Sequence, residues 1–132
     1  MSRNKQNSQK LISLTIATVA AGIPIATLSA AQLNFTSLNF IALWVLPGVI
    51  GSFVTYLYFS LKMRDVIGTF TLGYMLAVIL RFVADILINN VAHSDLSLAL
   101  LVALLCGAFS GWFGSFIWSM MRWQSRKQTS GK

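Results

Sequence analysis

Four long apolar stretches, separated by short polar segments, divide the chain. They cover residues 11–31, 40–61, 66–89 and 96–121. A helix of about 20 apolar residues is long enough to cross the hydrocarbon layer of a bilayer, and every stretch meets that length. The pattern predicts an all-α polytopic membrane protein with four transmembrane helices. We expect one four-helix transmembrane domain over residues 1–132, with short basic tails at 1–10 and 122–132.

The first apolar stretch has two interpretations. A basic start, an apolar run and the small residues Ser29, Ala30 and Ala31 are typical of a cleavable signal peptide. The run over 11–31 is longer than the roughly 7–15 apolar residues of such a signal, which favours a retained helix. Pro24 inside it predicts a kink, because its ring nitrogen cannot donate to the carbonyl of Ala20.

The positions of the basic residues predict the topology. The chain has 10 Lys and Arg residues, a net charge of +7 and a mean hydropathy of +0.72. The loops at 32–39 and 90–95 contain no Lys or Arg, whereas the tails and the turn at 62–65 hold all of them but Arg81. Basic residues near helix ends collect on the cytoplasmic side. We therefore expect a multi-pass protein of the plasma (inner) membrane with both termini in the cytoplasm.

The positive charge does not indicate a nucleic-acid partner, because the basic residues are dispersed over tails and a turn rather than gathered on one folded face. Arg122, Arg126 and Lys127 stand beside Trp123, a pattern typical of an interfacial anchor. The expected partner of this tail is a lipid bilayer with anionic headgroups. Docking of a cytoplasmic protein is the alternative.

Two charges interrupt the third apolar stretch. Arg81 and Asp85 are four residues apart, so they share one face of a helix. A charge at the centre of a membrane helix costs roughly 2.5–3.5 kcal/mol on insertion scales, so an intramembrane pair is expected. Counted from Val66, Arg81 lies about 22 Å into the helix, past the midplane of a layer about 30 Å thick.

The polar pair allows three interpretations. It can be a neutralised structural pair, part of a cavity or pore lining, or a proton or ion relay centred on Asp85. Further polar side chains follow the same helix face and the next loop. The possible cavity lining comprises Tyr74, Asn89, Asn90 and His93.

Small residues recur every fourth position along the last apolar stretch. They are Ala99, Ala103, Gly107, Gly111, Ser115 and Ser119. Such a stripe lets the backbone of another helix approach closely, which drives association in lipid. We expect Gly107, Gly111 and Ser115 to pack a helix, either in a second copy of the chain or within the same chain.

Catalytic and metal chemistry find little support in the composition. The chain has one His, one Cys and no Glu, so it lacks the several ligands of a zinc site and the paired carboxylates of acid–base catalysis. Cys106 lies in an apolar run, where a lone cysteine packs as a small hydrophobe. We expect no enzymatic activity, no metal and no cofactor.

Four helices, basic tails and this length resemble the architecture of phage holins, small channels and accessory subunits. The resemblance implies a self-associating pore or transport oligomer, holin-like or channel-like, with the Arg81 face as part of its lining. The alternative is a non-conducting accessory or assembly subunit of a larger membrane complex.

Overall fold

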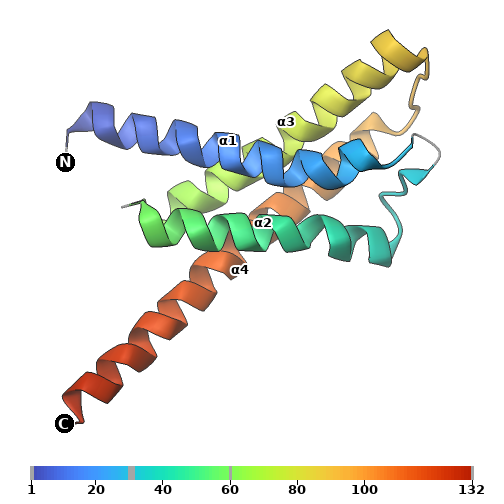
Figure 1. The fold of residues 1–132 in the computed structure, drawn as a ribbon. Helices are drawn as coiled ribbons and strands as arrows, with labels where there is room; N and C mark the ends of the chain where they lie inside the picture. The colour runs from blue at the N-terminus through green and yellow to red at the C-terminus, as the bar shows by residue number, and fades with distance from the viewer. Residues whose placement is uncertain (1, 30–31, 60, 132) are drawn as a thin grey trace.

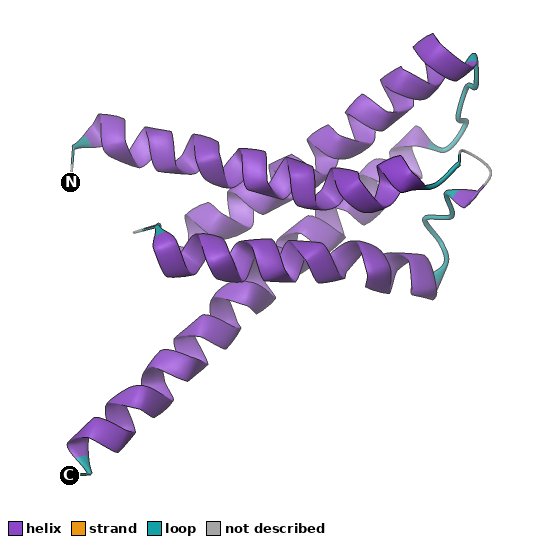
Figure 2. Cartoon of the chain, in the orientation of Figure 1, coloured by secondary structure: helices purple, strands orange, loops and turns teal. Residues whose placement is uncertain are grey.

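The computed structural model describes residues 2–29, 32–59 and 61–131, which form four helices joined by short connections (Figure 2). The helices are α1 (Arg3–Thr27), α2 (Leu38–Tyr58), α3 (Met63–Asn89) and α4 (Leu96–Ser130). Each is long and apolar enough to cross a membrane. The predicted all-helical class with four candidate spans is confirmed.

The helices extend further into the polar ends of the chain than hydropathy predicts. α1 begins at Arg3 rather than residue 11, and α4 continues to Ser130 rather than ending at 121. The residues in these extensions include Gln, Lys and Arg, which favour helix, and no proline interrupts them. With 35 residues, α4 is about 52 Å long, more than the thickness of the hydrocarbon layer. The predicted end of the first segment at 30–31 lies outside the described residues.

Both termini lie at the same end of the bundle. Figure 1 shows α1 and α2 running antiparallel, with α3 and α4 crossing them as a second antiparallel pair. Residues 28–29 and 32–37, which belong to the first connection, lie at the opposite end together with the 90–95 connection, and α4 projects past the other helices. α3 packs mainly on α4 and α1, and α2 packs mainly on α4 and α1, so the helices form a ring in the order α1, α3, α4, α2.

Glycines bring α4 against the backbone of α3. A Cβ atom on Gly107 would lie 2.7 Å from the carbonyl oxygen of Phe70, and one on Gly111 would lie 2.8 Å from the Cα atom of Ile67. Ser115 continues the stripe, and its hydroxyl donates to the Gly111 carbonyl at 2.7 Å. The small-residue stripe therefore packs inside the chain along α3, and self-association would have to use another surface.

A second close approach joins α1 to α3, and the sequence pattern did not single it out. A Cβ atom on Gly73 would lie 2.5 Å from the Ala17 Cβ atom and 2.9 Å from the Thr18 backbone nitrogen. Ala17 and Ala21 are fully buried on this face of α1. α3 is consequently held on two sides by backbone-to-backbone contacts.

Hydrogen bonds between helices satisfy several polar atoms of the core, although the buried Thr55 hydroxyl has no partner among the described residues. The Trp44 indole Nε1 donates to the Ala21 carbonyl at 2.9 Å, and the Tyr74 hydroxyl donates to the Trp44 carbonyl at 2.7 Å. The Ser52 hydroxyl donates to the Ser110 carbonyl at 2.6 Å. Polar groups buried without partners are costly, so these bonds fix how α1, α2, α3 and α4 meet.

Candidate functional site

A polar cluster forms at the end of α3 that lies beside residues 28–29 and 32–37 and the 90–95 connection. Arg81, Asp85 and Asn89 are spaced four residues apart and share one face of this helix. α3 ends at Asn89 and is capped by Asn90, which has the left-handed φ of 52° that asparagine tolerates better than most residues. The backbone N–H of Val91 donates to the Asp85 carbonyl at 3.1 Å. This helix end turns the chain back, so that the following loop reaches Asp85.

Asp85 is the centre of the cluster and is only 1% exposed. Its Oδ2 atom accepts from Arg81 Nε at 3.0 Å and lies 2.7 Å from His93 Nε2. Its Oδ1 atom accepts from Asn89 Nδ2 at 3.1 Å. An ionised carboxylate only accepts hydrogen bonds, so with Asp85 ionised the proton of this contact is on His93 Nε2. Three side chains thus compensate one buried carboxylate.

Arg81 connects this carboxylate to the end of α1. Its Nη1 atom donates to the Ile25 carbonyl at 2.8 Å. α1 ends at Thr27, so the Ile25 carbonyl belongs to the last turn, whose carbonyls lack partners within the helix. The last turn of α1 has no basic residue of its own, and Arg81 supplies the positive charge that favours a helix C-terminus. One guanidinium therefore joins α1 to α3.

Aromatic rings cover the cluster at this end of the bundle. The rings of Phe82 and His93 have centroids 4.5 Å apart. Phe35, from the 28–37 connection, lies 6.3 Å from Phe82, 5.3 Å from Phe40 and 5.5 Å from Trp44, measured between ring centroids. The imidazole of His93 is thus held by an apolar ring on one side and by Asp85 on another.

Asp85, Arg81 and His93 are mostly buried, whereas Asn89 is exposed. The side chains of Arg81 and His93 are 14% and 17% exposed, against 2% for Asp85. Arg81 also lines a groove of about 280 Å³ on the outer side of α1 and α3, together with Ala77 and Leu80 from α3. Arg81 is therefore the charged member of the cluster that borders this groove.

The structure brings together only part of the polar set suggested by the sequence. Arg81, Asp85, Asn89 and His93 converge, whereas Asn90 caps α3 and is exposed. Tyr74 is fully buried in the core, at its bond to Trp44, and does not line an opening. Sequence spacing could not identify the Ile25 carbonyl, because the contact joins residues 56 positions apart.

The chemistry available to the cluster is that of an internally compensated charge pair. Within residues 2–29, 32–59 and 61–131, no three His, Cys, Asp or Glu side chains come together as a metal site would require. Cys106 is free and buried among apolar residues. The arrangement can hold α1, α3 and the 90–95 loop in register.

Comparisons with protein-family models, with curated proteins and with solved structures gave no match for this chain. The functional argument is therefore built on the geometry of the chain itself.

Proposed function

We propose that this chain is a small, non-enzymatic integral membrane protein that acts as a non-conducting structural or assembly subunit. The observation that carries the proposal is the filled interior between the two ends of the bundle. Trp44, Phe70, Tyr74 and Val78 are each fully buried there. Large side chains in these positions oppose a water-filled path through a single copy.

The distribution of charge supports the same role. Asp85 is compensated inside the chain by Arg81, Asn89 and His93, so this cluster does not offer an unsatisfied ion-binding group. The outward helix faces are mostly apolar, as expected for contact with lipid or with other membrane helices. Well-exposed examples from the four helices are Val19, Leu43, Leu72, Leu87 and Leu105.

A flux measurement on purified protein tests this proposal. Reconstituted liposomes should release protons and small ions no faster than protein-free liposomes. Cross-linking in native membranes followed by mass analysis should place the chain in a complex with itself or with other membrane subunits. Ion flux that rises with the amount of protein would overturn the non-conducting role.

A holin-like or channel-like pore between several copies is the second candidate. The groove beside Arg81 favours it, because a second copy seated there would place a guanidinium at the boundary between protomers. In this case, the double substitution Arg81→Ala with Asp85→Ala should leave assembly intact and change the conductance. A conducting wild type with an unchanged double variant would exclude this lining.

We further propose that both termini face the cytoplasm, in the plasma (inner) membrane. The support is that the start of α1, the turn after α2 and the end of α4 lie together at one end of the bundle. These three segments hold the basic residues that set orientation, among them Lys5, Arg64 and Arg122.

A further inference from the structure

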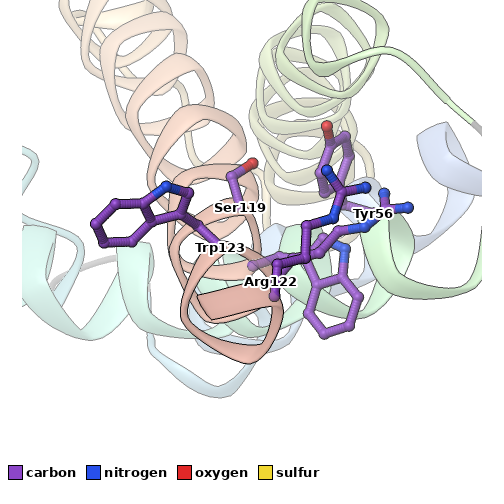
Figure 3. Close-up of a pocket in the computed structure, with 6 residues that line it drawn as sticks. Tyr56, Ser119, Arg122 and Trp123 are labelled. Carbon is purple, nitrogen blue, oxygen red and sulfur yellow. The ribbon is translucent and has the colours of Figure 1, made fainter. Parts of the chain in front are cut away.

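A pocket of about 270 Å³ opens at the end of the bundle that carries both termini, opposite the Asp85 cluster. It is lined by Tyr56 from α2 and by Trp118, Ser119, Arg122, Trp123 and Arg126 from α4. Figure 3 shows Arg122 extending toward Tyr56, with Trp123 on the other flank of α4. Two helices therefore enclose a basic and aromatic site.

The two arginines of this pocket lack a carboxylate partner among the described residues. They are four positions apart on one helix face, where like charges repel each other. The chain has no Glu, and of its three Asp side chains, Asp65 pairs with Lys10 at 3.3 Å and Asp85 pairs with Arg81. An anion held between Arg122 and Arg126 would relieve their repulsion, and it would have to come from outside the described chain.

The position of the pocket along α4 indicates where that anion comes from. About 20 helical residues cross the hydrocarbon layer, so a helix that enters at Leu96 leaves it near Trp118. Trp and Tyr side chains favour the membrane–water interface, which fits Tyr56 and Trp118. Arg122 and Arg126, one and two turns further on, then lie at the level of the lipid headgroups.

We propose that this pocket binds the phosphate of an anionic phospholipid headgroup. A guanidinium presents a planar pair of donors that matches phosphate oxygens, and charge-assisted bonds of this kind are stronger than neutral ones. The hydroxyl of Tyr56 supplies a further donor at the pocket wall, whereas the Ser119 hydroxyl already donates to the Ser115 carbonyl at 2.9 Å. The indole of Trp118 borders the region where the lipid glycerol meets the acyl chains. The proposal requires that α4 span the membrane, but it does not depend on whether the protein conducts ions.

Native mass spectrometry of the full chain in detergent tests the site. The probes are phosphatidylglycerol and phosphatidylcholine, added at equal concentrations. The pocket variant combines Arg122→Gln with Arg126→Gln, and the charge-matched control combines Arg3→Gln with Lys5→Gln. We expect the wild type to retain phosphatidylglycerol in preference to phosphatidylcholine. The pocket variant should bind phosphatidylglycerol about tenfold more weakly than the control, because only it removes the paired guanidiniums.

Two further measurements are needed. One distinguishes binding of the lipid from binding of free phosphate, and the other distinguishes recognition by the paired guanidiniums from attraction by positive charge alone. Inorganic phosphate at the same concentration should not raise the melting temperature, whereas phosphatidylglycerol should. The double variant Arg122→Lys with Arg126→Lys preserves charge but not the planar donor pair, so it should also weaken retention of phosphatidylglycerol. The arginines are exposed, so all variants should melt like the wild type without lipid. Equal losses in pocket variant and control, equal retention of both lipids, or stabilisation by inorganic phosphate alone would overturn the proposal.

Discussion

Removing Asp85 should harm the fold more than removing Arg81 and Asp85 together. In Asp85→Ala, Arg81 keeps its bond to the Ile25 carbonyl but loses its carboxylate partner, and Asn89 and His93 lose their acceptor as well. The double variant with Arg81→Ala removes both charges and leaves the exposed Asn89 as the polar side chain of the former trio on this helix face. The two side chains are therefore coupled, and their effects should not add.

The structure gives the order of the effects. Loss of one partner from a buried pair costs about 3–5 kcal/mol, but Arg81 is partly open to the surface, so we expect about 2–3 kcal/mol for Asp85→Ala. Arg81→Ala leaves Asp85 bonded to Asn89 and His93 and should cost about 1–2 kcal/mol. The double variant should cost about 1 kcal/mol or less, because no uncompensated charge remains.

A double-mutant cycle measures this coupling. The free energy of unfolding of the wild type, both single variants and the double variant is obtained by denaturant titration in mixed micelles, with Leu87→Ala, at a nearby exposed side chain of α3, as the control. The single variants should each be less stable than the double variant, with a coupling energy of about 2 kcal/mol or more. Additive single effects would show that the guanidinium and the carboxylate do not stabilise each other, which would refute the reasoning.

Three other predictions follow from the packing and the topology. Gly111→Leu should lower the melting temperature strongly, because a Cβ atom at position 111 would lie only 2.8 Å from the Ile67 Cα atom. Leu104→Ile, on the exposed face, should change the melting temperature little. Equal melting temperatures of the two variants would contradict the contact. His93→Ala should destabilise the protein by about 1–2 kcal/mol through loss of its bond to the Asp85 carboxylate, and an unchanged unfolding curve would rule that contribution out. Reporter fusions at Asn34 and Lys127 should give opposite locations, with the Lys127 fusion cytoplasmic; a translocated Lys127 fusion would reverse the proposed orientation.

The number and order of the helices could be predicted because apolar length alone specifies a candidate span. The ends of the helices could not be predicted in the same way, because hydropathy shows only where a segment is apolar. α1 begins at Arg3 and α4 ends at Ser130, in polar sequence where helix propensity determines the boundary. The stripe through Gly107 and Gly111 predicts a close helix contact, but the sequence does not say whether the partner helix is in the same chain. Only the position of Phe70 and Ile67 on α3 answers that question.

The sequence predicts those contacts of the candidate site that lie within one helix. It does not predict the contacts that join segments far apart in the chain. The spacing of Arg81 and Asp85 within one helix is enough to predict their contact. His93 reaches Asp85 only because the chain turns back after Asn90, and the Ile25 carbonyl is available only because α1 ends two residues later. Both contacts depend on how separate helices end, which residue periodicity does not encode.

The polar cluster and the glycine contacts constrain different neighbours of α3. Gly107 and Gly111 fix α4 through backbone contact, while Arg81 holds the end of α1 through the Ile25 carbonyl. α1 also meets α3 at Gly73, nearer the middle of the helix. Removing Arg81 should therefore loosen the last turns of α1 and leave the α3–α4 contact in place. Arg81, paired with Asp85, fixes the C-terminal end of α1. This structural role of the charged pair agrees with the proposed function as a structural or assembly subunit.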